Sequence, residues 1–343
     1  MSAQPMTGPP ADYAIIGPPQ SGKTSLIAAL LERADSSYTD HPGPLPSFRW
    51  ADEDPAGGST ADALRGEIGQ AIHNGGRVGA TGSRTSILRF SMSLPGERWG
   101  GVLRGAAPPM TFSVVDGGGE LLMPVAEVTR DQAYAESRQA YAAALRQARG
   151  VILCIPVYPG APWHQLEGMR EIMALMRSSR CRLERLVVCL TKYEYATAAY
   201  GCRAFDLAQR EEVFSDRVIG EVLGPDFLES LRVLASSRAQ RGGPLDIAIT
   251  PLSVYGFIHR NGCANFDLWH PHGSGGMLLQ AAAPEPQSTP GTRDWPLYEA
   301  SEVRRLWVPY RIIEPFTYLL TGQGGSLTIP LERLLRRDAT ARS

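Results

Sequence analysis

Lysine is nearly absent from this sequence. The 34 basic residues include only two lysines, Lys23 and Lys192, and all the others are arginine. A surface ion pair tolerates either side chain, whereas a slot that holds a compact ammonium against phosphate does not accept the broad, planar guanidinium. The two lysines therefore mark candidate binding sites.

Other features that the sequence lacks exclude whole classes of protein. Its longest strongly apolar runs, such as 151–157, are far shorter than the roughly 20 residues that cross a bilayer. No run of like charge is present, and 34 basic residues nearly balance 35 acidic ones, so we expect no membrane span and no nucleic-acid partner. The five cysteines form no C-x-x-C pair, and their odd number favours reduced thiols in a cytoplasmic protein.

The remaining composition is that of a globular protein. Apolar residues make up 43% of the 343 residues, which is enough for a sizeable core. Short apolar runs alternate with segments of helical spacing. The expected strands are 13–16, 86–94, 110–115, 151–157, 186–190 and 246–252, and the expected helices are 25–33, 131–149, 165–178 and 309–320. This alternation predicts an α/β fold, a doubly wound and mostly parallel sheet with one antiparallel edge strand, in which 86–94 pairs antiparallel with 110–115.

Segments of different composition interrupt the alternation. The first residues are rich in proline and glycine and lack the basic start and apolar stretch of a signal peptide, so we expect a loose leader. Two later segments read as insertions, the first rich in Gly, Pro, Ser and Asp and the second mostly helical. The predicted division is a leader (1–11), a domain (12–320) with insertions at about 35–85 and 193–243 and a mobile loop at about 273–297, and a peripheral C-terminal tail (321–343).

The first lysine belongs to a phosphate-binding motif. The segment GPPQSGKT, which ends at Lys23 and Thr24, has the G-x-x-x-x-G-K-[ST] spacing of a P-loop, or Walker A motif, and stands between an apolar strand and a helix. In a P-loop, main-chain amides ring the phosphates, the lysine reaches the β and γ oxygens, and the hydroxyl binds Mg²⁺. Two prolines have no N–H to donate, but 20–24 still offer five amides. The predicted nucleotide-binding residues here are Gly17, Pro19, Gln20, Ser21, Gly22, Lys23, Thr24 and Ser25.

A second motif follows the strand 110–115. Asp116 opens the sequence DGGGE, in which a carboxylate can hold the Mg²⁺ shell and glycine lets the main chain approach the γ-phosphate. Gly119 is the candidate γ-phosphate amide. Asp116 is therefore a candidate metal ligand beside Thr24.

Taken with TKYE at 191–194 and Ser253-Val254 after the next strand, these motifs occur in an order that resembles the Ras-like P-loop GTPases of the translation-factor class (TRAFAC). The resemblance implies a G-domain-like fold that binds GTP or GDP with Mg²⁺. It also implies that Lys192, which follows Thr191, lies along the guanine ring and that Glu194 pairs with the base. Ser253 and Val254 would back the base.

Two residues depart from that family's pattern. Glu194 stands where the family has aspartate, and its extra methylene leaves the choice between guanine and adenine open. Glu120 stands where many relatives have the glutamine that positions the attacking water, which favours slow hydrolysis.

The γ-phosphate and Mg²⁺ are expected to be sensed by a switch threonine before the strand 86–94. Thr81 is preferred, and Thr85 and Thr60 are the alternatives. An arginine of a partner, or Arg77 or Arg84 within this chain, is a candidate for stabilising the transition state, and an ordinary surface position is the favoured alternative for these two residues. The predicted catalytic residues are Lys23, Glu120 and Thr81, and the predicted metal ligands are Thr24, Asp116 and Thr81.

These features predict a GTP-binding and slowly GTP-hydrolysing molecular switch of bacterial type. Its insertions and arginine-dominated composition also resemble bacterial double-GTPase proteins of multi-component signalling or conflict systems, which implies a regulator, an effector or a second GTPase-like protein as partner. Two alternatives stay open. One is an ATP-using P-loop ATPase or phosphotransferase, favoured by Glu194, and the other is an assembly module that holds nucleotide without turnover, favoured by Glu120.

The histidines of WHPH at 269–272 lack the Cys or acid spacing that completes a metal site.

Overall fold

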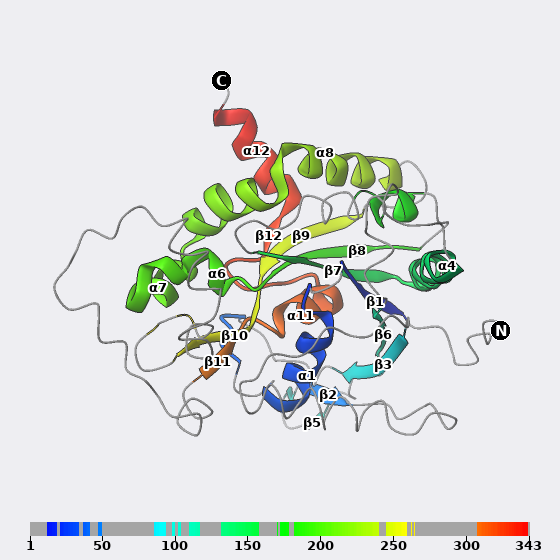
Figure 1. The fold of residues 1–343 in the computed structure, drawn as a ribbon, viewed down its shortest axis with the longest axis horizontal. Helices are drawn as coiled ribbons and strands as arrows, with labels where there is room; N and C mark the ends of the chain where they lie inside the picture. Colours follow the sequence, from blue (N-terminus) through cyan, green and yellow to red (C-terminus); the bar gives the residue numbers. More distant parts are fainter. Residues whose placement is uncertain are drawn as a thin grey trace.

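The computed structural model describes slightly more than half of the chain. The described residues are 12–18, 21–33, 37–41, 47–49, 86–93, 98–99, 102–103, 110–116, 132–157, 170, 172–177, 182–239, 245–258, 262, 264 and 307–341. Helices and strands are named as in Figure 1.

An eight-stranded sheet with parallel central strands lies at the centre of the fold (Figure 1). The strand order is β12-β9-β8-β7-β1-β6-β3-β2. The five parallel strands are β9 (Asp246–Pro251), β8 (Arg185–Thr191), β7 (Gly150–Pro156), β1 (Tyr13–Ile16) and β6 (Met110–Asp116). They are short apolar runs, as expected for strands covered on both faces. The prediction of an α/β fold with a mostly parallel sheet is confirmed.

Both edges of the sheet are antiparallel. β3 (Ser86–Ser93) pairs antiparallel with β6, as predicted, but β2 (Ser47–Arg49) lies outside it and pairs antiparallel with β3. At the opposite edge β12 (Ile329–Pro330) pairs antiparallel with β9. The predicted antiparallel edge is therefore present, but the additional antiparallel strands β2 and β12 were not predicted, because strands of two or three residues are too short to show a hydrophobic period.

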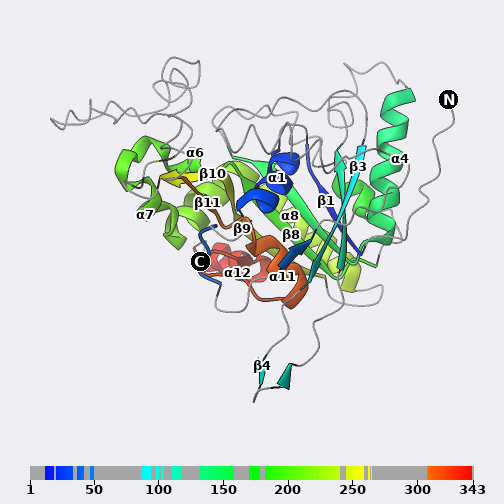
Figure 2. The ribbon, with the colours of Figure 1, turned by 90° about the horizontal axis from the view of Figure 1, so that it is seen from below.

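Helices cover both faces of the sheet, so the fold is doubly wound. α1 (Lys23–Arg33) and α11 (Glu314–Thr321) lie below the sheet in Figure 1 and face the viewer in Figure 2. α8 (Gly220–Ala239) and α12 (Leu331–Ala341) lie above it, and α4 (Gln132–Gln147) covers the same face. Alternate residues of β7 point into two separate cores. Val151 and Leu153 belong to the α4 and α8 side, and Ile152 and Cys154 belong to the α1 and α11 side.

The segment between β8 and β9 is mostly helical, as predicted. It contains α6 (Glu194–Thr197), a 3₁₀ segment (Ala198–Arg203), α7 (Ala204–Ala208) and a π-helix (Val213–Ile219) that continues into α8. Residues 172–177 are also helical, within the helix expected at 165–178. Two antiparallel hairpins complete the described structure, β10 (Ser253–Ile258) with β11 (Trp307–Tyr310) and β4 (Arg98–Trp99) with β5 (Val102–Leu103). No helix in these described ranges is both long and apolar enough to cross a membrane.

The C-terminal region differs most from the sequence-based expectation. Instead of one helix over 309–320, β11 ends at Tyr310, and Arg311 adopts a left-handed conformation (φ 55°) before α11 begins with Pro315 in its first turn. A left-handed residue cannot continue a helix, which explains the break. The tail is not peripheral either. Its buried side chains, Leu327, Ile329, Leu331 and Leu334, belong to the core above the sheet.

Candidate functional site

The candidate motifs lie at one edge of the sheet, where the parallel strands end. β1 pairs in register with β7 and β6, and β7, β8 and β9 are aligned so that Pro156 stands beside Thr191 and Leu190 stands beside Pro251. The segments that follow β1, β8 and β9 therefore leave the sheet side by side. Ligands of open α/β sheets bind at the carboxyl ends of the strands. The candidate site is therefore the side of the sheet where the five parallel strands end, called the sheet edge below.

The loop between β1 and α1 wraps around the Lys23 ammonium. Lys23 is 3% exposed, and its Nζ donates hydrogen bonds of 2.9 Å each to the main-chain oxygens of Gly17 and Pro18. α1 begins at Lys23 and has no acidic residue in its first turn, so the positive end of the helix dipole is not neutralised locally. A buried ammonium and a helix N-terminus thus meet within one short loop.

Two glycines give this loop its shape. Gly22 has a φ of 84°, which favours glycine because a side chain there is strained. At Gly17 an added Cβ would lie 2.8 Å from Ser21 Oγ and would also collide with the main-chain oxygen of Cys154. The motif's two glycines therefore meet two different requirements, one of main-chain conformation and one of space.

Side chains from neighbouring elements fasten the loop. The Tyr141 hydroxyl on α4 donates a 3.1 Å hydrogen bond to the Gly17 oxygen. The Thr191 hydroxyl at the end of β8 donates a 2.7 Å hydrogen bond to the Ser21 oxygen. Thr191 was predicted to belong to the base-binding loop, and in this structure its side chain joins the end of β8 to the loop between β1 and α1. No local pattern distinguishes Tyr141 from any other inward-facing aromatic residue, so the sequence did not identify it.

The second lysine lies at a sharp turn after β8. Lys192 has a φ of 56°, unusual for a residue with a side chain. The Tyr193 N–H donates a 3.1 Å hydrogen bond to the Leu252 oxygen, and the Tyr195 N–H donates one of 3.1 Å to the Lys192 oxygen. The first bond joins the segment after β8 to the segment after β9, and the second closes the turn at Lys192.

Glu194 and Ser253, both candidates for contact with the base, are hydrogen-bonded to each other in this turn. Both side chains are buried, and the Ser253 hydroxyl is hydrogen-bonded to the Glu194 carboxyl group. Ser253 Oγ also accepts a 2.6 Å hydrogen bond from the Gly256 N–H. The serine therefore connects the carboxyl group to the main chain of β10.

Burial dominates the electrostatics of Glu194. Loss of hydration raises its pKa to about 7, although the Ser253 hydrogen bond, a main-chain hydrogen bond and the charge of Lys192 all act in the opposite direction. Glu194 is 1% exposed, and its Oε2 atom has no hydrogen-bond partner within the described part of the chain. Such a carboxyl group is costly as a bare anion and has an acceptor to offer to a ligand.

Stacked aromatic rings connect the Lys192 turn to a buried cluster of ion pairs. The ring of Tyr193 stacks on Tyr310 with centroids 5.9 Å apart, and Tyr310 stacks on Tyr38 at 5.4 Å. Next to Tyr310, the fully buried Arg311 pairs with Glu314 at 2.8 Å and with Asp40 at 2.6 Å. The hairpin β10–β11 and residues 37–41 after α1 are thereby held behind the Lys192 turn.

The other predicted site residues are placed as follows. Thr24 is buried at the start of α1, and Ser25 is half-buried beside it. Val254 is buried in the core on the α1 side of the sheet. Asp116 ends β6, opposite Ser86 of β3. The remaining candidates lie outside the described residues, namely Pro19, Gln20, Gly119, Glu120, Thr81, Thr85, Thr60, Arg77, Arg84 and 269–272.

The two metal-ligand candidates with a described main chain, Thr24 and Asp116, belong to segments that leave adjacent strands at the same edge of the sheet. Among the described residues, no three or more His, Cys, Asp or Glu side chains are grouped so that they could hold a metal ion. A magnesium ion held by Thr24 and Asp116 would therefore need further ligands from outside the described side chains.

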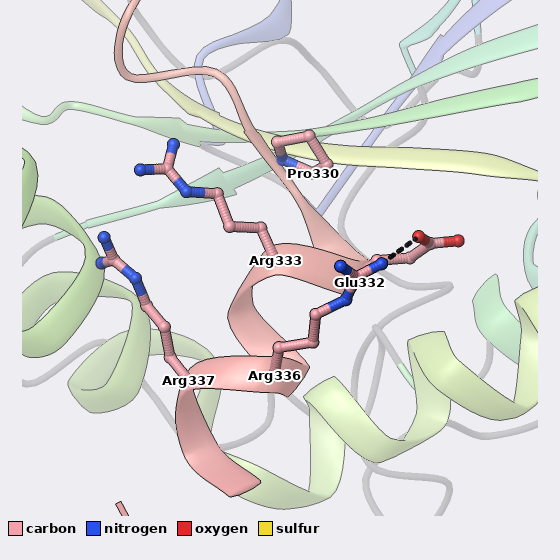
Figure 3. Close-up of a pocket in the computed structure, with 5 residues that line it drawn as sticks. All are labelled: Pro330, Glu332, Arg333, Arg336 and Arg337. Atoms are coloured by element: carbon pink, nitrogen blue, oxygen red, sulfur yellow. Dashed lines mark ion pairs between the residues drawn. The ribbon is translucent and has the colours of Figure 1, made fainter. Parts of the chain in front are cut away.

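A concavity of about 530 Å³ lies on α12 (Figure 3). It is lined by Pro330, Glu332, Arg333, Arg336 and Arg337. Its cations are already paired with acids: Arg333 and Arg337 contact Glu211 at 2.8 and 2.6 Å, and Arg336 contacts Glu332 at 3.5 Å. Because charges of both signs lie close together there, this surface has no strong preference for an anion.

Comparison of the chain with models of protein families and with curated proteins finds no match. The function is therefore argued from the geometry of the sheet edge.

Proposed function

We propose that this protein is a Mg²⁺-dependent GTP-binding switch that hydrolyses GTP slowly and acts through a protein partner. The observation that carries the proposal is the position of Lys23, whose buried ammonium is held by main-chain oxygens of the loop between β1 and α1. Carbonyl oxygens bear only partial negative charge. The β and γ phosphates of a nucleotide bear full charges and are the stronger partners for this ammonium.

The surroundings of Lys23 suit phosphate in two further ways. The first turn of α1 carries no acid, so the positive end of the helix dipole meets an incoming anion without local repulsion. Thr24 follows at the second position of α1, where its hydroxyl and the Asp116 carboxylate would hold Mg²⁺. The ion would neutralise charge that develops on the phosphates.

The Lys192 turn supports a guanine base as the other half of the ligand. Its Thr191 hydroxyl is bonded to the P-loop, so the turn and the phosphate site form one structure. Glu194 and Ser253 are adjacent, and Glu194 Oε2 is a buried acceptor with no partner among the described residues. Guanine offers N1–H and N2–H donors that match a carboxylate.

The test is the identity of the nucleotide that remains with the purified protein. We expect acid extraction followed by anion-exchange chromatography to recover GDP or GTP from the native chain and none from Lys23→Ala. Arg336→Ala, which removes an exposed cation on α12, is the matched control and should retain the nucleotide. Failure of the native chain to retain any nucleotide, together with no thermal stabilisation by millimolar GTP and Mg²⁺, would refute the proposal.

An ATP-using enzyme is the second candidate, and the observation that favours it is again Glu194. A protonated carboxyl group offers one donor and one acceptor, as an adenine-binding site requires. Thermal unfolding separates the two candidates, because a ligand at 100 times its Kd stabilises the native state by roughly 2.7 kcal/mol. A larger stabilisation by ATP than by GTP at neutral pH would favour the ATPase or phosphotransferase. Retention of GTP without turnover, alone or with partners, would favour an assembly module.

A further inference from the structure

We propose that Glu194 makes the base preference of this site depend on its own protonation: the ionised carboxylate selects guanine, and the protonated carboxyl group admits adenine. This inference rests on the proposed function, since it concerns the same nucleotide site. The argument starts from Glu194 Oε2, which is buried and has no hydrogen-bond partner within the described part of the chain. Because the side chain is 1% exposed, bulk water is not a ready substitute for that partner.

Either a proton on the carboxyl group itself or an N–H donor of a ligand can satisfy this oxygen. The first corresponds to the protonated form of Glu194 and the second to the ionised form. With no donor nearby, the carboxyl group keeps its proton and avoids the cost of a buried charge. When guanine supplies N–H donors from N1 and N2, both carboxylate oxygens accept hydrogen bonds and the ionised form is stabilised. Binding of guanine to the protonated group therefore breaks the carboxyl O–H bond and releases that proton to the buffer.

The protonated group has a different hydrogen-bonding pattern. It presents one O–H donor and one acceptor oxygen, much as a glutamine amide presents an NH₂ donor group and one acceptor oxygen. The pairing edge of adenine offers the complement, an acceptor at N1 and a donor at N6. The same side chain therefore fits guanine in one state and adenine in the other.

The neighbouring groups leave this equilibrium near neutral pH. Lys192 is the cation that acts on Glu194 and favours ionisation, as does the hydrogen bond from Ser253 of β10, but burial outweighs both and holds the pKa at about 7. The elements packed against α6 carry Arg203 and Asp206, which are exposed to solvent and screened by water. With a pKa of about 7, the ionised fraction rises roughly tenfold from pH 6 to pH 8 and the protonated fraction falls by about the same factor.

Calorimetric titrations with Mg²⁺ and either GDP or ADP, from pH 6 to pH 8, test the inference. Both nucleotides carry the same diphosphate, so titration of the phosphates cancels in the ratio of their Kd values. We expect the preference for GDP over ADP to rise between about tenfold and a hundredfold over this range in the native protein. In Glu194→Gln, which keeps one donor and one acceptor at every pH, the ratio should be constant and shifted toward ADP.

A second measurement does not depend on the variant. Repeating the GDP titration at pH 6.5 in two buffers with different ionisation enthalpies counts the protons released on binding. Release of about one half to one proton is expected from a group that titrates near pH 7. GDP binding with a ratio that stays constant with pH and no proton release would overturn this inference and leave the proposed function intact. No binding of GDP or ADP at any pH would refute the proposed function, and this inference with it.

Discussion

Replacing Gly17 and Gly22 by alanine, with Gly220 as a control, tests how tightly the loop between β1 and α1 is packed. At Gly17 the new methyl group would lie 2.8 Å from Ser21 Oγ and collide with the Cys154 main-chain oxygen, which is part of β7 and cannot move alone. Overpacking of this kind typically costs about 1 to 3 kcal/mol. At Gly22 the nearest Thr191 atom is 3.9 Å away, so space is available, but the φ of 84° strains alanine by about 1 to 2 kcal/mol. At Gly220, at the start of α8, no atom lies within 4 Å, and alanine should stabilise the helix by up to about 1 kcal/mol.

Urea denaturation of the three variants measures these changes, and titration with GDP and Mg²⁺ measures their effect on the site. We expect the free energy of unfolding to be highest in Gly220→Ala, followed by the native protein, then Gly22→Ala, and lowest in Gly17→Ala. We also expect weakened nucleotide binding only in the two loop variants, because the loop amides can no longer surround the phosphates. Native-like stability and native-like GDP affinity in Gly17→Ala would refute the described loop geometry, since no room exists there for the methyl group.

Three further predictions concern the surroundings of the site. Thr191→Val removes the hydroxyl that joins β8 to the Ser21 oxygen, and we expect a loss of about 1 to 3 kcal/mol in urea denaturation together with weaker GDP binding; unchanged values for both would show that this hydrogen bond is unimportant. Arg311→Met leaves Glu314 buried without its cation and should cost about 3 to 5 kcal/mol by the same assay. Burial raises the pKa of Asp40, but hydrogen bonds from Arg311 and Ser326 and the charge of Arg311 outweigh it, so the net pKa is lowered. The stability that Asp40 contributes is therefore complete above its unfolded pKa of about 3.9 and is lost as the pH falls through the folded value, and Asp40→Asn should flatten stability measured across that acidic range.

The central sheet was predictable from the sequence because its strands are nearly continuous apolar runs. β1 and β7 are buried over their whole length, and such runs show themselves without knowledge of their partners. The helix α1 was also predictable, because its apolar residues have helical spacing and follow the glycine-containing loop directly. The motif order then predicted which loops would lie at one edge of the sheet, since parallel strands end at the same side.

The features that the sequence did not give depend on long-range contacts. β12 has two residues, and only its pairing with β9 makes it a strand. The break between β11 and α11 occurs at Arg311, whose left-handed conformation accompanies its buried contacts with Asp40 and Glu314. Asp40 is 271 residues away along the chain, and no local pattern reveals such a partner. The hydrogen bond from Tyr141 to Gly17 spans 124 residues and was missed for the same reason.

The candidate base-binding residues were predicted by type, but their environment was not. Glu194 and Ser253 were each expected beside the base. Their mutual hydrogen bond, their burial and the Oε2 atom that has no partner among the described residues emerge only from the packing of α6 against β10. The switch and catalytic candidates Thr81, Gly119 and Glu120 lie outside the described residues and stay predictions.

The most direct test of the central claim is a crystal structure of the protein grown with Mg²⁺ and a non-hydrolysable GTP analogue. We expect the phosphates to lie within the loop between β1 and α1. We also expect Lys23 Nζ to leave the oxygens of Gly17 and Pro18 and to contact the β and γ phosphates. An analogue bound elsewhere, or a loop without nucleotide in which Lys23 still donates to those two oxygens, would contradict that claim.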